Sequence, residues 1–306
     1  MKKILLLSCL VCAMFGVKAQ SLSDGIFMDK HYVCAGVQYS HDSWDQYWEG
    51  TLLRKNGNIG TVTTQSAVLM ANYGILNQLN VIAMVPYVWT NASAGTLTGL
   101  KGVQDLTLGL KYKLLETEIL KGKFSIQLVG GGIIPLTNYV ADFLPMSIGL
   151  HSKTLFGRSI LHFAGAKHLS LLVSGTFMRR GNVEIDRTSY YTTHQVYSNQ
   201  VDMPDAAQLA FRGGYYSYRW AAELIAEKNS TLGGFDIRRQ DMPFLSNDMD
   251  ATRVGITASY RLPFLADLQV IGTAMQTLDG RNMGKSLTWS AGITKFFGPA
   301  KKAAAQ

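Results

Sequence analysis

The chain has 306 residues, of which 47% are hydrophobic and 16% are charged, and it contains 30 glycines. Soluble domains carry about 25% charged residues, so the composition is poor in charge, and it excludes disorder, whose signature is high charge with low hydrophobicity. The net charge is +8, but the Lys and Arg residues are not clustered with aromatic residues, which predicts no nucleic-acid partner. Beyond the N-terminus no apolar run reaches the roughly 20 residues of a spanning helix, which leaves a β-rich protein, either secreted or embedded in a membrane as a barrel.

The N-terminus has the pattern of a bacterial secretory signal peptide. Residues 1–3 include two lysines, residues 4–15 are almost wholly apolar, and residues 17–19 offer small side chains for cleavage before Gln20. We therefore predict a signal peptide over residues 1–19, which is too short to act as a membrane anchor. Residues 20–30 are then expected to form an N-terminal periplasmic segment that tucks into one end of the folded domain.

The cysteines argue against a disulfide-stabilised domain. Of the three cysteines, Cys9 and Cys12 leave with the signal peptide, and Cys34 has no partner in the mature chain. A lipoprotein would use Cys9 or Cys12 as its acylated residue, but Cys9 is too near the N-terminus and Cys12 lacks a small residue before it. Backbone pairing and side-chain packing alone are expected to hold the fold.

Beyond residue 30 the hydrophobic pattern repeats every two residues, as it does in strands with one apolar and one polar face. The clearest segment is 104–114, where Leu108 and Leu110 alternate with Thr107 and Lys111. The sequence predicts an all-β fold with about 12 strands, although 14 is an open alternative. The expected strands are 31–41, 60–73, 79–90, 102–114, 122–134, 147–164, 168–179, 205–216, 220–228, 251–262, 268–278 and 286–297.

The connections between these strands alternate in length. Short ones, such as 165–167 and 217–219, are followed by long ones, such as 180–204 and 229–250. Short turns at one end and long loops at the other, on an even number of strands, are typical of an up-and-down barrel in the bacterial outer membrane. We predict a transmembrane antiparallel β-barrel over residues 31–297, a C-terminal tail over 298–306, and location in the cell outer membrane.

A secreted β-sandwich or a lipocalin-like protein would show similar alternation, but two features favour a membrane barrel. Strands of this length match the roughly 9–11 residues that a tilted strand needs to cross the hydrocarbon. The last expected strand ends in Phe296 and Phe297, which is similar to the aromatic-ending strand by which such barrels are recognised for assembly. The predicted partners are therefore outer-membrane lipid and the barrel-assembly machinery.

Residues 73–135 contain motifs of a known group of barrels. Tyr73-Gly74 leads through a polar turn to Val85-Pro86-Tyr87, and Gly102-Val103-Gln104-Asp105-Leu106-Thr107-Leu108-Gly109-Leu110-Lys111-Tyr112 follows before Ile134-Pro135. This segment resembles the meta-pathway phenol-degradation family of bacterial outer-membrane β-barrels, although Gln104 stands where the family usually has glycine. The resemblance implies movement of hydrophobic or aromatic compounds across the outer membrane, and it carries over no catalytic residues.

The polar faces of the expected strands provide the candidate site. Charged residues there would point into the lumen and pair with one another, or they would form a selectivity ring. We favour structural pairing over a selectivity ring. These candidates for ligand or lumen contact are Asp105, Lys111, Arg212, Glu223, Arg253 and Arg261.

A second candidate site lies in the long connection 180–204, where Tyr190, Tyr191 and Tyr197 would form a mouth for flat hydrophobic ligands or simply pack the loop. Other groupings predict no chemistry. Ser159 and His162 lie three residues apart on one strand and face opposite sides, and the histidines show no metal-binding spacing. We expect no enzyme, no cofactor and no metal site, and the aspartates of the connection 229–250 match no calcium-binding loop.

The sequence thus predicts an outer-membrane barrel for passive passage or binding of small hydrophobic or aromatic molecules. The alternative is a plugged structural or interaction barrel that docks a partner through its long extracellular loops. A small-molecule solute is the partner expected under the first hypothesis. The identity of the solute, the patency of the lumen and the oligomeric state are left open at this stage.

Overall fold

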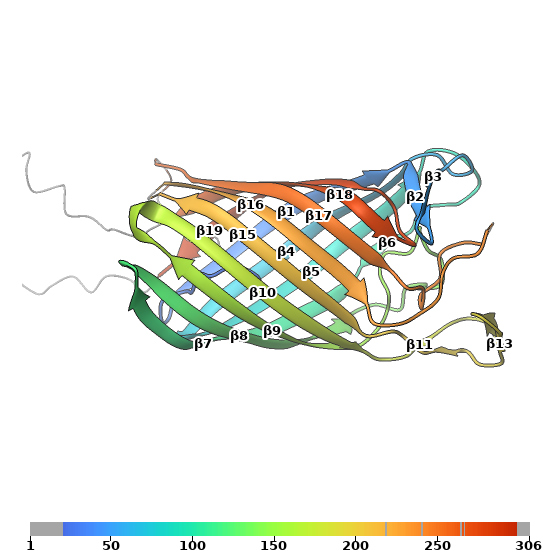
Figure 1. Cartoon of the computed structure of the whole chain (residues 1–306), viewed down its shortest axis with the longest axis horizontal. Helices are drawn as coiled ribbons and strands as arrows, with labels where there is room; N and C mark the ends of the chain where they lie inside the picture. The colour runs from blue at the N-terminus through green and yellow to red at the C-terminus, as the bar shows by residue number, and fades with distance from the viewer. Residues whose placement is uncertain (1–20, 218, 240, 264, 266, 299–306) are drawn as a thin grey trace, which may run out of the picture.

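The computed structural model describes residues 21–298, except 218, 240, 264 and 266, and it is a closed antiparallel β-barrel (Figure 1). The signal peptide predicted over residues 1–19 and the tail predicted beyond Gly298 lie outside the described residues. The barrel has 12 strands, which confirms the predicted fold class. Their bounds are β1 (Val33–Trp44), β4 (Val62–Leu76), β5 (Leu79–Ala92), β7 (Asp105–Ile119), β8 (Gly122–Pro135), β9 (Thr154–Ala164), β10 (Leu169–Arg180), β15 (Ala206–Tyr216), β16 (Trp220–Thr231), β17 (Asp250–Arg261), β18 (Leu268–Arg281) and β19 (Leu287–Phe297).

The barrel closes because its first strand pairs with its last. β1 runs antiparallel to β19, from Val33 opposite Phe297 to Ser43 opposite Leu287, and its other edge pairs with β4. The intervening strands pair with their neighbours in chain order. Lipid offers no hydrogen bonds to a free strand edge, so this closure is what allows a sheet to span a bilayer.

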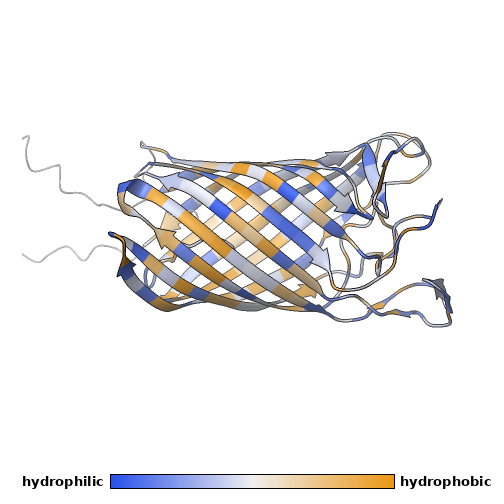
Figure 2. Ribbon diagram, in the orientation of Figure 1, coloured by the Kyte–Doolittle hydropathy of each residue, from blue (hydrophilic) through white to orange (hydrophobic). Residues whose placement is uncertain are grey.

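The two faces of the wall differ in polarity, and Figure 2 shows apolar and polar residues alternating along the strands. On β10, Ser170 and Leu172 are buried on the inner face, whereas Leu171 and Phe177 are 61% and 49% exposed on the outer face. A continuous exposed apolar surface of this kind is unfavourable in water and favourable in lipid tails. The outer face is therefore a lipid-facing belt.

Outward-facing aromatic side chains lie in two groups on this belt. One group lies near the short turns and includes Tyr215 and Trp220, whose ring centroids are 4.9 Å apart. The other lies nearer the long connections and includes Tyr39, whose ring lies 6.1 Å from that of Trp89 and 5.4 Å from that of Trp289. Two separated aromatic groups are the arrangement of interfacial girdles at the two surfaces of a membrane.

Helical structure contributes little to this fold. A 3-10 turn, Ala166–His168, links β9 to β10. None of the helical structure in the described part of the chain is long and apolar enough to cross a membrane.

The connections are short at one end of the barrel and long at the other, as predicted. At the short end, β4 and β5 are joined by residues 77–78 and β7 and β8 by residues 120–121. At the long end, the connections contain short strands of their own. These are β2 (Gln46–Glu49) paired with β3 (Leu52–Lys55), β6 (Lys101–Val103) paired with β5, β11 (Val183–Glu184) paired with β14 (Gln200–Val201), and β12 (Tyr190–Tyr191) paired with β13 (Gln195–Val196).

The connection from β8 to β9 is longer than the sequence predicts. The strand expected over 147–164 begins only at Thr154. Met146 and Ile148 are 0% and 4% exposed, and the carbonyl oxygen of Met146 accepts a 2.7 Å hydrogen bond from Thr90 Oγ1 on β5. Of these two residues only Ile148 lies within the expected strand, and its burial in a folded loop shows that tertiary packing overrides the local pattern there.

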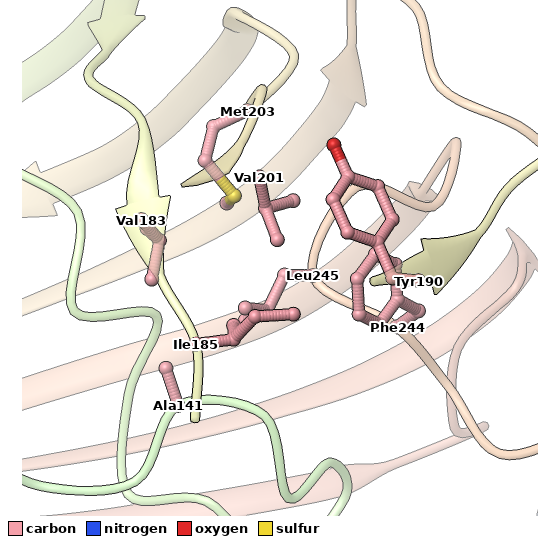
Figure 3. Close-up of a cluster of buried hydrophobic side chains, with 8 residues drawn as sticks. All are labelled: Ala141, Val183, Ile185, Tyr190, Val201, Met203, Phe244 and Leu245. Carbon is pink, nitrogen blue, oxygen red and sulfur yellow. The ribbon is translucent and has the colours of Figure 1, made fainter. Parts of the chain in front are cut away.

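Three long connections share a hydrophobic core of their own (Figure 3). Ala141 belongs to the connection 136–153, Tyr190 to 181–205, and Phe244 to 232–249. The rings of Tyr190 and Phe244 lie 5.3 Å apart. The buried members of this loop core are Ala141, Val183, Ile185, Tyr190, Val201, Met203, Phe244 and Leu245.

Candidate functional site

The interior of the barrel is occupied by the start of the described chain. Residues 21–32, which we call the strap, contact inward-facing side chains of the wall. Gln127 Nε2 on β8 donates a 2.9 Å hydrogen bond to the carbonyl oxygen of Gly25, and Arg158 Nη1 on β9 donates one of 2.9 Å to that of Leu22. The sequence pattern places residues 20–30 at one end of the barrel, and the described part of this segment reaches the inner wall between β5 and β15.

Lys111 on β7 holds the strap most directly. Its side chain is fully buried, and its Nζ atom lies 2.9 Å from Asp24 Oδ1. The same atom donates hydrogen bonds of 3.2, 2.6 and 3.0 Å to the carbonyl oxygens of Ser21, Asp24 and Ile26. A buried ammonium group is stable only when paired and hydrogen-bonded, so the strap supplies the environment that lets Lys111 lie inside the wall. We call this ion pair the Lys111–Asp24 latch.

Next to the latch, the side chain of Leu22 lies in an apolar pocket of the inner wall. The pocket is formed by four buried residues from β5, β8, β9 and β10, with Met84 and Phe156 packed beside them. Gly109 on β7 leaves room for this side chain, since a Cβ atom there would lie 2.5 Å from Leu22 Cδ2. The four buried wall residues are Ile82, Val129, Ile160 and Leu172, and with Met84, Phe156 and Gly109 they define what we call the Leu22 pocket.

The strap ends where it joins the barrel wall. The backbone amide of His31 donates a 2.7 Å hydrogen bond to the carbonyl oxygen of Gly74 on β4, and the amide of Gly74 donates one of 3.0 Å to that of Tyr32. Met28 packs with Cys34 and Phe296 at this end of the lumen. The strap is thus part of the backbone pairing at residues 31 and 32, whereas side chains of the wall hold residues 22–26.

The other predicted lumen residues also lie on inner faces, but they mostly pair with residues that the sequence analysis did not single out. Arg212 Nη1 and Glu223 Oε2, both predicted, lie 3.7 Å apart. Arg253 Nη1 lies 3.6 Å from Glu227 Oε1, and Arg261 Nη2 lies 3.5 Å from Asp267 Oδ1. Two of these ion pairs therefore join side chains of neighbouring strands, and the third joins Arg261 to Asp267 in the turn after β17.

Asp105 lies at the opposite, loop-bearing end of β7. Its Oδ1 atom accepts a 2.6 Å hydrogen bond from the hydroxyl of Tyr139, which belongs to the connection 136–153. Burial, reinforced by this carboxylate, raises the pKa of Tyr139 above its usual range, so the phenol remains a donor. Asp105 therefore fixes a loop to the mouth of the barrel and is separated from the latch along the strand.

An open cavity of about 240 Å³ lies between the strap and the wall formed by β15–β19, β1 and β4. Ser21, Ser23 and Asp24 line it from the strap, and Arg212 and Glu223 from the wall. Ser23 Oγ accepts a 3.0 Å hydrogen bond from Arg212 Nη2, while Arg212 Nε has no partner among the described residues. The strap side of this cavity is thus polar, whereas Met70, Ile225 and Ile271 line it from the wall with apolar groups.

A second cavity of about 410 Å³ lies among the long connections. Tyr191 lines it, and the guanidinium of Arg238 stacks 3.9 Å from the Tyr191 ring centroid. Tyr190 is buried in the loop core, and Tyr197 is 87% exposed. The three tyrosines predicted to form a mouth therefore occupy three different environments, and Tyr191 is the one that the structure places in the cavity.

Ion pairs frame the same loop cavity. Arg187 Nη2 lies 2.7 Å from Asp142 Oδ2, and Arg238 Nε lies 2.7 Å from Asp241 Oδ2. Burial raises the pKa of Asp142, and the nearby Arg187 partly opposes that shift. Since each arginine already has a carboxylate partner, the cavity has no excess of charge that would select an ion.

The sequence analysis missed the residues that organise the lumen, namely Leu22, Asp24, Gln127 and Arg158. Arg158 shares the inner face of β9 with Phe156 and Ile160, so the period-two pattern did not mark that face as polar. Asp24 lies in a segment without periodicity, and no local pattern marks it. Within the described residues, no group of three or more His, Cys, Asp or Glu side chains is placed to hold a metal ion.

Comparison with known proteins identifies the fold. No family model and no curated protein matches the chain. The structure is similar to an outer membrane channel from Pseudomonas putida F1, with a TM-score of 0.71, 13% identity, and coverage of 92% of this chain and 100% of that chain. It is also similar to the NanC porin, with a TM-score of 0.50, 7% identity, and coverage of 85% and 98%. The chain therefore has the fold of outer-membrane channel barrels, and its lipid-facing belt and aromatic girdles fit that membrane.

Proposed function

We propose that this chain is a passive outer-membrane channel for small hydrophobic or aromatic molecules. The observation that carries the proposal is the Leu22 pocket, an apolar surface on the inner wall of a closed barrel. A channel that passes only water and ions is not expected to have four buried aliphatic side chains on its inner wall, because apolar surface in contact with water is unfavourable. Such a surface suits molecules that leave water for an apolar site.

The motifs that resemble the meta-pathway phenol-degradation family support this proposal. Gly109 and Lys111 lie within the motif on β7, and both contact the strap. Ile82, which lies between the motif residues of β4 and β5, forms part of the Leu22 pocket. Two residues of the motif on β7 thus lie at the strap, and membership of that particular family is part of the proposal.

Liposome swelling tests the proposed passage. The folded protein is reconstituted into vesicles, and swelling is followed with small solutes that differ in polarity but match in size. A channel of this kind gives faster swelling with small uncharged solutes than empty vesicles do, with a sharp limit on solute size because the strap narrows the lumen. A folded barrel that shows no solute flux, and no co-purified small molecule by native mass spectrometry, contradicts the proposal.

A plugged interaction barrel is the second candidate. It is favoured by the loop core, which gives the connections 136–153, 181–205 and 232–249 a fixed structure suited to docking. The barrel-assembly machinery would still be its partner during insertion. Shortening the connection 181–205 separates the candidates, because a plugged docking barrel loses its external partner and shows no solute flux before or after the change, whereas a channel changes the range of solutes that pass.

A further inference from the structure

The strap presents two different faces to the lumen. Ser21, Ser23 and Asp24 line the open cavity, whereas Leu22 points the other way and is buried in the wall at 7% exposure. One segment of chain therefore covers the apolar part of the inner wall and offers polar groups in its place. A solute in the open cavity meets the polar groups of the strap, whereas the apolar cluster that holds Leu22 lies behind the strap.

We propose that the Leu22 pocket is a binding site for a small hydrocarbon group, and that Leu22 occupies it as an internal competitor. This inference rests on the proposed function and assigns it a site. Val129, Ile160 and Leu172 are each buried at 3% or less, so the pocket is enclosed like a protein interior. A leucine side chain seated in an enclosed apolar pocket shows directly which chemistry the pocket accepts, namely a branched or flat hydrocarbon group about the size of an isobutyl or phenyl group.

The wall is shaped for this occupant. Gly109 and Gly131 face each other across β7 and β8, and a Cβ atom on Gly109 would lie 2.5 Å from Leu22 while one on Gly131 would lie 2.6 Å from Phe156. Glycine at both positions leaves a hollow in the wall, which the side chains of Leu22 and Phe156 fill. Flat or branched groups fill a hollow of this kind without moving the backbone.

The polar contacts that hold the strap around Leu22 in place can be exchanged for contacts with water. The backbone carbonyl oxygens of Leu22 and Gly25 accept hydrogen bonds from Arg158 and Gln127, and the latch joins Asp24 to Lys111. Water can replace each of these polar partners, whereas the strands of the wall are fixed by continuous backbone ladders. A hydrocarbon group therefore enters the pocket by displacing Leu22, and the barrel itself stays closed.

Photolabelling tests the inference at single residues. The folded full chain is incubated in detergent with a phenyl diazirine, irradiated, and mapped by mass spectrometry. Neighbouring residues of one strand serve as internal controls, because Val129 and Ile160 face the pocket whereas Leu128 and Leu161 are exposed on the outer face. Leu22→Ala leaves an apolar cavity of the type that binds benzene-sized molecules, and Leu120→Ala, at a residue that is 85% exposed in a short turn, is the matched control.

We expect labelling of the pocket residues to rise about tenfold in Leu22→Ala at limiting probe, since burial of a leucine side chain corresponds to about that factor in affinity. Labelling of the outer-face residues should stay unchanged in both variants, and pocket labelling should fall when unlabelled toluene is added. Asp24→Asn, which weakens the latch and keeps Leu22, should raise pocket labelling by a smaller factor. A heat-modifiability gel shows whether Leu22→Ala folds. If it does not, Asp24→Asn is used as the test in its place.

Equal labelling of Val129 and Ile160 in the wild type and in both folded strap variants overturns the inference. So does a rise that toluene does not compete. The swelling assay reads the channel separately. Solute flux without pocket labelling supports the proposed passage and contradicts the assigned binding site. Pocket labelling without solute flux identifies a barrel that binds hydrocarbon groups and contradicts the proposed passage.

Discussion

Replacing Lys111 by methionine removes the charge that joins the strap to β7 while preserving most of the side-chain volume. Lys111 Nζ donates four hydrogen bonds to the strap, and its distance to Asp24 Oδ1 is 2.9 Å. The methionine leaves the backbone ladders of β7 with β5 and β8 untouched. The loss is therefore confined to the strap, and the barrel should remain closed.

The size of the effect follows from the burial of the pair. Lys111 is fully buried and Asp24 nearly so, and removing one partner of a buried ion pair costs about 3–5 kcal/mol because the other charge is left unpaired. At about 1.4 kcal/mol per factor of ten, strap opening should increase by roughly two to three powers of ten. The remaining contacts of Leu22 and Gly25 contribute about 1–3 kcal/mol each, so the strap is expected to exchange between bound and open states.

Hydrogen exchange of the backbone amides in residues 22–32 measures this opening directly in the folded barrel. The control is Lys123→Met, since Lys123 is 65% exposed and lies 4.0 Å from Glu116, and an exposed pair of this kind contributes about 0–1 kcal/mol. The double variant with Asp24→Leu should exchange more slowly than Lys111→Met alone, because no unpaired buried charge remains. Exchange in Lys111→Met within threefold of the control would refute the assignment of the latch.

Three further outcomes are expected. Gly109→Val should also speed strap exchange, because its Cβ would lie 2.5 Å from Leu22 and overpacking of this kind costs about 1–3 kcal/mol; unchanged exchange would show that the hollow is not needed. Asp236 lies 2.7 Å from Arg281, and this hydrogen bond lowers the pKa of Asp236 to about 2. The pairing is therefore present above the ordinary aspartate range and is lost only as the pH falls toward that value, so a carboxyl 13C titration with a midpoint near 4 would contradict it. Leu224→Arg, at a residue that is 68% exposed on the outer face, should lower the free energy of unfolding in lipid vesicles by about 2–4 kcal/mol in urea titrations, and no loss would argue against contact with lipid.

The sequence was sufficient to predict the barrel fold because the period-two pattern recurs along the strands. On β10 the alternation of Ser170 and Leu171 gives both the element and the direction of each face. The pattern failed at the start of β9, where Ile148 was expected in the strand and belongs to a loop that folds over the mouth. Local alternation cannot distinguish a strand residue from a loop residue that is buried by contacts distant in the chain.

The candidate site was predicted less completely, for a different reason. Inner-face alternation identified Lys111, Arg212 and Arg253 as lumen residues, because a charge on a polar face points inward in a membrane barrel. It could not identify their partners, since Asp24 is 87 residues away from Lys111 in sequence and lies in a segment without a repeating pattern. Pairing across a lumen depends on which strands and which segment meet there, and a single sequence does not contain that information.

The chemistry of the latch also determines the kind of path that an open strap would create. A barrel of 12 strands has an interior between one filled by side chains and an open pore, so the strap takes up space that wall side chains leave free. When the strap moves, Lys111 loses its carboxylate and carbonyl partners, and only water or a polar solute group can replace them. The Leu22 pocket beside it is apolar and gains from excluding water. In an open lumen, Lys111 would therefore be hydrated, whereas water would be excluded around Ile160. A molecule with one polar group on a hydrocarbon body can interact favourably with both surfaces, which neither water nor a pure hydrocarbon can do.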